Sequence, residues 1–154
     1  MAHVQDVAAY ILEERGPMTA MKLQKLCYYS YGYHLAWEER RLFPEHFEAW
    51  ANGPVCPALY SKHRGQFEVT AGDVAGDLAG MDDGERESVN LVLNAYGDFT
   101  AYQLSQLTHD EAPWKNARAR VGARAAERST ARLTDSDIMV HFEALVAANA
   151  DGEE

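Results

Sequence analysis

The sequence predicts a mainly α-helical fold, a compact domain of about seven helices around a central aromatic-rich helix. The prediction depends on two observations. Apolar residues recur at the spacing of one helical face along most of the chain, and Gly, Pro and capping residues divide it into segments of helical length. The segment from Met21 to Trp37 is apolar around most of a helical cylinder, which indicates a helix with neighbours on most sides.

A Gly16-Pro17 stop separates the first two helices. Residues 3–15 carry apolar side chains on one helical face, and Thr19 is placed to cap the central helix that follows. The least apolar stripe of the central helix holds four residues, Lys25, Tyr29, Gly32 and Ala36. Because glycine weakens a helix, the position of Gly32 beside Ala36 indicates close approach of another backbone.

A short strand or hairpin is expected near residues 46–52, where apolar residues alternate before the turn sequence Asn52-Gly53-Pro54. Pro57 suits the first turn of a short helix, which Gly65 ends. The Gly- and Asp-rich residues 72–84 then indicate a loop.

The second half of the chain holds three helix-opening signals. The first is the pair Asp82 and Glu85, the second is Thr100 and the third is Thr134. Between the last two, Pro113 interrupts the chain after a His109-Asp110-Glu111 corner, and Trp114 begins another helical stretch. These signals complete the expected set of helices.

Length and composition fit one domain at residues 1–150, with a frayed C-terminus at residues 151–154. Hydrophobic residues make up 47% and charged residues 25% of the 154-residue chain, as in an ordinary globular protein. Cys27 and Cys56 lie in apolar runs outside any CxxC pair, which indicates a reduced, cytoplasmic protein. A signal-peptide pattern and a run of about 18 apolar residues are both absent, so we expect neither export nor membrane insertion.

Charge is distributed unevenly along the chain. The net charge of -10 disfavours general attraction to nucleic acid or anionic lipid. Between Lys115 and Arg132, six basic residues and one acid give +5, which leaves -15 for the rest. Arg120, Arg124 and Arg128 are four apart and would line one side of a helix. A solvated face is the favoured interpretation, with an acidic partner or nucleic acid as alternatives.

Neither a catalytic site nor a metal or cofactor site is predicted. The sequence has six histidines and two cysteines, but no HExxH, CxxC, paired HxxxH or glycine-rich phosphate-binding motif. Cys27 and His34 share a face of the central helix, yet seven residues of helix place them roughly 10 Å apart, too far for direct proton transfer. We therefore expect a buried, hydrogen-bonded His34 and no enzymatic activity.

The corner at His109 and Asp110 is a candidate site, because corners between helices often present functional side chains. A structural role is favoured, in which Asp110 caps the next helix and His109 stabilises the C-terminus of the preceding one. Recognition of a partner is the main alternative. Trp50 and Trp114 flank the two corners, and each suits either a core position or an interface.

Three segments together resemble the Panacea domain family, which includes SocA-like antitoxins and GepA-like phage-associated proteins. They are KLQKLCYYSYGYHLAW, FEAWANGPVCPALY and LSQLTHDEAPW, in that order, with a weaker match at IMVHFEAL. Cys56 and the arginine-rich stretch depart from the family pattern. The family's marked positions correspond here to Lys22, Leu23, Lys25, Leu26, Tyr28, Tyr29, Ala49, Trp50, Gly53, Pro54, Val55, His109, Pro113 and Trp114.

The resemblance implies an antitoxin that binds and neutralises a cognate, translation-inhibiting toxin encoded by the adjacent gene. The alternative that it implies is an adaptor that delivers the toxin to a ClpXP-type protease. A nucleic-acid-binding regulator that uses residues 115–132 is less favoured, and no cofactor is implied. Since a scaffold that serves several toxins must vary somewhere, we expect the arginine-rich stretch to influence partner choice. The partner-binding candidates are Trp50, Asn52, Gly53, Pro54, His109, Asp110, Trp114, Arg120, Arg124 and Arg128.

Overall fold

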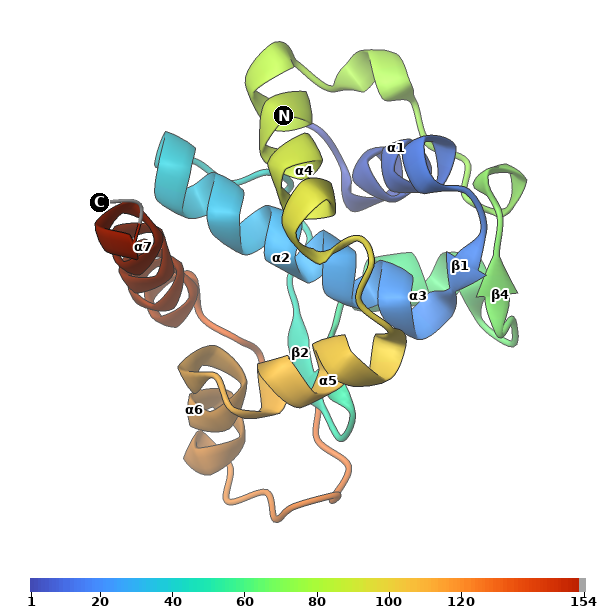
Figure 1. Ribbon diagram of the computed structural model, residues 1–154. Helices are drawn as coiled ribbons and strands as arrows, with labels where there is room; N and C mark the ends of the chain where they lie inside the picture. The colour runs from blue at the N-terminus through green and yellow to red at the C-terminus, as the bar shows by residue number, and fades with distance from the viewer. Residues whose placement is uncertain (153–154) are drawn as a thin grey trace.

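The chain folds around helix α2 (Ala20–Glu38), which crosses the middle of the molecule (Figure 1). The computed structural model describes residues 1–152, and the side chains of residues 1–150. Within that range lie seven α-helices, two 3-10 helices and two small antiparallel sheets of two strands each. The mainly helical fold that the sequence predicts is confirmed.

The other elements are arranged on all sides of α2. Helices α1, α4, α5 and α7 and strand β3 pack against it. Their bounds are α1 (Val4–Arg15), β1 (Met18–Thr19), β2 (Glu48–Trp50), β3 (Gly53–Val55), α3 (Pro57–His63), β4 (Glu68–Val69), η1 (Ala71–Asp73), η2 (Leu78–Gly80), α4 (Asp83–Tyr96), α5 (Ala101–His109), α6 (Ala112–Arg120) and α7 (Asp135–Gly152). The loop expected at residues 72–84 thus contains short 3-10 turns, and α4 begins at its end.

Helix α2 is buried around its whole circumference over most of its length. Every residue from Leu23 to Leu35 is buried, including Lys25 and Tyr29 of the least apolar stripe. Tyr29 meets the ring of Phe142 edge-on at 5.8 Å, a favourable aromatic geometry. The expectation of neighbours on most sides is therefore confirmed, and the helix is interior scaffold.

Helix starts follow the predicted capping signals. The Thr19 hydroxyl accepts a hydrogen bond from the Lys22 amide at 3.2 Å. Asp82 and Glu85 form the predicted reciprocal capping box of α4, Thr100 caps α5, and Thr134 accepts from the Asp137 amide at 3.1 Å. These local interactions explain why the sequence places the helix starts well.

Gly32 makes room for a side chain, so the expectation of close backbone approach there is wrong. A Cβ at Gly32 would overlap the ring of Phe142, which α7 inserts against α2. Phe142 is fully buried and contacts several tyrosines of α2, so it has little space to move. A helix side chain, and not a helix backbone, occupies the position that glycine leaves open.

We expect Gly32→Ala to lower the free energy of unfolding by about 1–3 kcal/mol, because the added methyl group overpacks the core. Urea unfolding measures the change. Phe142→Leu made alone and together with Gly32→Ala supplies a double-mutant cycle. The smaller Leu should relieve part of the Gly32→Ala penalty, whereas strictly additive effects would contradict the proposed overlap.

The hairpin expected near residues 46–52 is confirmed, but its turn lies earlier than the sequence suggests. Strand β2 pairs antiparallel with β3, with Trp50 opposite Gly53 and Glu48 opposite Val55. Ala51 and Asn52 form the turn, and Gly53 and Pro54 belong to the second strand. Gly53 adopts φ +120°, a conformation that favours glycine.

The arginine-rich stretch is not helical beyond Arg120, so the predicted face of Arg120, Arg124 and Arg128 does not form. Helix α6 ends at Arg120, and both Gly122 and Ala126 have positive φ values, 67° and 64°. Positive φ is incompatible with a continuing right-handed helix. The stretch then runs along the edge of β2, where Ala131 accepts from the Ala49 amide at 2.7 Å.

The C-terminal helix α7 continues to Gly152. The predicted fraying of residues 151–154 stays a prediction, because residues 153–154 lie outside the described part. Of the helices in residues 1–152, none has both the length and the apolarity to span a membrane.

Candidate binding groove

A groove of about 670 Å³ lies between the start of α2, the β2–β3 hairpin and α3. Ala101 at the start of α5 and residues 128–130, in the loop before α7, complete its walls. The segments that border it are on the lower right in Figure 1. Its large apolar wall residues are Met21, Trp50, Val55, Tyr60 and Phe67.

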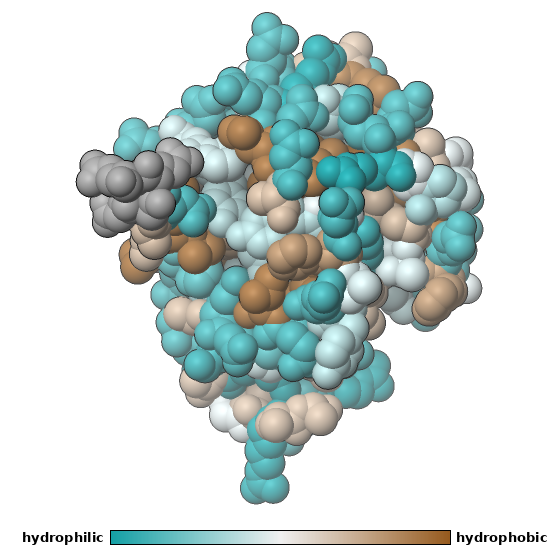
Figure 2. Space-filling view, viewed as in Figure 1, coloured by the Kyte–Doolittle hydropathy of each residue, from teal (hydrophilic) through white to brown (hydrophobic). Residues whose placement is uncertain are grey.

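The rim of the groove exposes large apolar side chains. Phe67 is 83% exposed and Met21 is 38% exposed. Figure 2 shows a mostly hydrophilic face of the molecule on which apolar residues form small patches. Exposed apolar surface next to a concavity is typical of binding sites.

Trp50 is held in position within the groove wall. Its indole N–H donates to Oε1 of Glu48 at 2.9 Å, and its ring meets Tyr60 edge-on at 5.0 Å. Tyr60 in turn contacts the ring of His63 edge-on at 5.4 Å. A row of rings from β2 to α3 therefore forms a rigid apolar wall.

Gln24 connects α2 to α3 at the inner side of the groove. Its Oε1 accepts from the Cys56 amide at 2.9 Å, and its Nε2 lies 3.0 Å from Nε2 of His63. Burial lowers the pKa of His63, which keeps the ring neutral near pH 7. Buried hydrogen bonds of this kind fix the relative position of the two walls.

Lys25 also lines the groove, and it is the unusual residue of the site. The side chain is buried, with 1% of the residue exposed, and its Nζ donates to the Pro54 carbonyl at 3.2 Å. No carboxylate lies within ion-pair distance of this ammonium in the described chain. Burial lowers the pKa of Lys25 to about 7. In the described chain, the groove thus contains a buried amine without an anionic partner.

The structure brings together the two corners that the sequence singles out. The Trp114 indole donates to the Trp50 carbonyl at 2.8 Å, and the Ser105 hydroxyl donates to the Asn52 carbonyl at 2.6 Å. The His109 ring stacks on Trp114 at 4.3 Å with an interplanar angle of 17°. The α5–α6 corner therefore supports the hairpin from the side.

Some of the predicted partner-binding residues line the groove, and the others lie outside its wall. Trp50, Asn52 and Arg128 line the groove. Gly53 packs against Lys25 and Thr108, where a Cβ would come within 2.5 Å of Lys25 Cε and 2.8 Å of Thr108 Oγ1. The remaining candidates outside the groove wall are Gly53, Pro54, His109, Asp110, Trp114, Arg120 and Arg124.

Asp110 does not cap the next helix, contrary to the structural prediction. It lies at the C-terminus of α5, and Glu111 takes the N-terminal cap position of α6 without a capping side-chain bond. The Glu111 carboxylate accepts instead from the Tyr29 hydroxyl at 2.9 Å, which connects the corner to α2. Burial first, and then Lys25 and Arg118, lower the pKa of His109, so its ring is neutral near pH 7 and stacks without a charge.

Arg118 belongs to the interior, although the sequence places it in the basic segment. Its guanidinium is almost fully buried and donates to the carbonyls of Ala49, Arg124 and Glu127 at 2.9, 2.7 and 2.6 Å. The guanidinium also stacks over the Trp114 ring, 4.9 Å from its centre. Arg118 thereby holds the loop that carries Arg128 against the hairpin.

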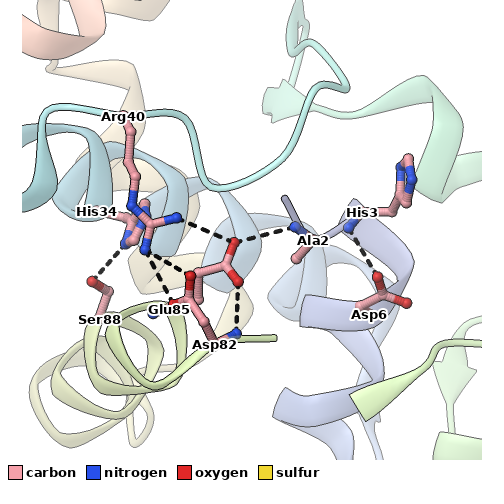
Figure 3. A network of polar contacts seen from close by, with 8 residues as sticks. All are labelled: Ala2, His3, Asp6, His34, Arg40, Asp82, Glu85 and Ser88. Carbon is pink, nitrogen blue, oxygen red and sulfur yellow. Dashed lines mark hydrogen bonds and ion pairs between the residues drawn. The ribbon is translucent and has the colours of Figure 1, made fainter. Parts of the chain in front are cut away.

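A second polar cluster, which joins α1, α2 and α4, is structural (Figure 3). Arg40 pairs with Asp82 at 3.0 Å, and Glu85 accepts from the Ala2 amide at 3.2 Å. His34 is fully buried with Nδ1 2.8 Å from the Ser88 hydroxyl, so the predicted buried, hydrogen-bonded histidine is confirmed. No group of three or more potential metal ligands occurs in the described part of the chain.

Met21, Tyr60 and Phe67 line the groove but were not singled out in the sequence. Of the three, only Phe67 could have been recognised from the sequence as an exposed residue, because it is an isolated aromatic between Gly65-Gln66 and Glu68. Met21 and Tyr60 fit the apolar faces of helices and give no such indication.

Comparison with known proteins finds a family and a relative that match most of the chain. The family model for antitoxin SocA-like proteins, Panacea domain, matches residues 23–115. The chain is similar to Antitoxin SocA of Caulobacter vibrioides (strain NA1000 / CB15N), with 30% identity over 110 residues. That alignment covers 64% of this chain and 58% of the relative, so the chain spans less than two thirds of the relative's length. No solved structure matches the chain.

Proposed function

Because the chain belongs to the SocA-like, Panacea domain family of antitoxins, we propose that it neutralises a cognate protein toxin by direct binding. The family resemblance carried by the three sequence segments is confirmed. In this proposal the toxin is a translation inhibitor encoded by the adjacent gene, and the chain acts by occluding it and not by catalysis.

The observation that supports this proposal best is the coincidence of the family match with the groove. Residues 23–115 include α2 from Leu23, the hairpin, α3 and the start of α5, which supply most of the groove wall. Buried aromatic anchors in a pocket, with exposed apolar residues beside them, are the usual elements of a tight protein interface. We propose that the toxin places an apolar segment in this groove.

Partner choice is proposed to depend on the groove wall outside the family match. Arg128, Ser129 and Thr130 line the groove but follow the matched region. They belong to the loop that Arg118 holds against the hairpin. A shared apolar wall with a separate polar edge would let related domains bind different toxins.

We expect Phe67→Ser to weaken toxin binding at least about tenfold, because burial of an exposed aromatic side chain contributes more than about 1.4 kcal/mol. Phe67 is 83% exposed, so the substitution should leave the fold intact. The adjacent gene product, purified with each variant, serves as the ligand in isothermal titration calorimetry.

Val140→Ser is the matched control, since Val140 is 68% exposed on α7 and does not line the groove. Its affinity should equal that of the unmodified chain. Equal losses in both variants, or no loss in Phe67→Ser, would remove the groove from the proposal. A neighbouring gene product that is neither toxic nor bound would argue against the antitoxin function itself.

Two alternative functions, a proteolytic adaptor and a nucleic-acid-binding regulator, each have a test of their own. Toxicity that returns on co-expression in a protease-deficient host would favour delivery of the toxin to a ClpXP-type protease over occlusion. The nucleic-acid alternative has less support than the sequence suggested, because Arg118 is buried and Arg120 pairs with Asp137. Salt-sensitive DNA binding that is lost when Arg120, Arg124 and Arg128 become Ala would support the nucleic-acid alternative.

A further inference from the structure

We propose that the groove receives an acidic side chain of the partner protein, flanked by apolar residues, and that Lys25 is its counter-ion. This inference rests on the proposed function, since it specifies the chemistry of the toxin segment that enters the groove. It names Lys25 as a binding residue, whereas the family pattern marks it only as part of the α2 motif.

The first observation is the state of the Lys25 ammonium. It has three N–H donors, and the Pro54 carbonyl is the acceptor that the described structure provides for it. Charged groups are rarely buried without a partner, because their desolvation is then uncompensated. A carboxylate that enters from the groove would supply both the missing acceptors and the missing negative charge.

The second observation is the charge of the groove wall. The chain as a whole has 24 acidic and 14 basic residues, yet among the described residues the wall contains Lys25 and Arg128 and no Asp or Glu. The other titratable groups near this region are Tyr60 and His63 on α3, His109 on α5, Arg118 on α6 and Glu48 on β2. Burial lowers the pKa of both histidines, and the Glu48 carboxylate, which lies outside the wall, is already bonded to the Trp50 indole and to His46. The groove is complementary to an anion.

The third observation is the shape and composition around Lys25. The groove has a volume of about 670 Å³, much more than a carboxylate requires, and most of the surface that its wall exposes is apolar. The apolar surface continues outward to Phe67 and Met21 at the rim. A peptide segment with apolar side chains around one Asp or Glu fits these features, and its apolar neighbours would exclude water from the ion pair.

Calorimetric titration of the full chain with the adjacent gene product tests the inference. At pH 8 in buffers of different ionisation enthalpy, binding should take up close to one proton, because Lys25 has a pKa of about 7 and becomes charged beside a carboxylate. Lys25→Met should abolish the uptake and weaken binding at least about tenfold. Lys62→Met removes an exposed lysine outside the groove wall and should change neither. Unchanged affinity and proton uptake in Lys25→Met would overturn the inference.

A peptide probe keeps the inference testable if the gene product does not bind and the proposed function fails. The probes are Ac-Phe-Glu-Leu-NH2 and Ac-Phe-Gln-Leu-NH2, titrated into the full chain and followed by NMR shifts of groove amides. A preference for the Glu peptide that disappears in Lys25→Met supports the carboxylate site. Equal response to both peptides, no response to either, or a preference retained in Lys25→Met would overturn it.

Discussion

Replacing Arg118 with Met is expected to lower the free energy of unfolding by about 3–5 kcal/mol, the largest loss of any single substitution considered. The buried guanidinium donates to three carbonyls, those of Ala49, Arg124 and Glu127. Met fills much of the same volume but donates no hydrogen bond, so these acceptors lose a charged donor. Each such bond to a charged group contributes about 1.5–3 kcal/mol, partly offset by the desolvation of the guanidinium.

Arg120→Met is the matched control, two residues further along α6. Arg120 is half-exposed and pairs with Asp137 at the surface, so its loss should cost no more than about 1 kcal/mol. Urea unfolding separates the two variants, and hydrogen exchange at the Ala49 amide, which bonds to Ala131, shows whether the loop has come free of the hairpin. Similar, small losses in both variants would show that Arg118 does not hold the loop.

The helices could be predicted because their signals are local. Thr19, Thr100 and Thr134 each accept a hydrogen bond from an amide three residues ahead, and such a contact depends on the sequence alone. The hairpin also follows from a local pattern of alternating residues that ends at a turn. Its exact turn was missed because Gly53 is needed where β3 packs on Lys25 and Thr108, a contact between distant segments.

The arginine-rich stretch shows where local signals mislead. Its alanines and arginines favour a helix. Instead, Gly122 and Ala126 adopt positive φ, and the carbonyls of Arg124 and Glu127 accept from Arg118, which holds the stretch as a loop against the hairpin. Nothing in the sequence distinguishes Arg118 from its neighbours at four-residue spacing. The distinction arises from the Trp114 ring and the Ala49 carbonyl, which the fold places beside it.

The groove is still harder to foresee, since its walls come from four separate parts of the chain. Lys25 belongs to the least apolar stripe of α2, where a lysine suggests exposure, and the hairpin buries it. The hairpin then has two roles. One side rests on Trp114 and Arg118, and the other presents Trp50 and Asn52 to the groove.

The stability of the chain is expected to rise between about pH 7 and pH 10 because of Lys25. Burial lowers the pKa of Lys25 from its ordinary value of 10.5 to about 7 in the folded chain. Between these values the unfolded chain holds a proton that the folded chain has released, so raising the pH favours the folded state. The full effect is at most about 4–5 kcal/mol, and below pH 7 the cost of the buried charge is present in full.

Lys25→Met isolates this contribution, because other lysines and tyrosines also titrate in the alkaline range. At pH 6 the variant should be more stable than the unmodified chain, and the difference should shrink toward pH 10; Lys62→Met should follow the unmodified chain throughout. Parallel stability curves for all three proteins would show that burial does not lower the pKa of Lys25. If the expected curves are found, a bound carboxylate partner should flatten the pH dependence, because pairing raises the pKa of Lys25 toward its ordinary value.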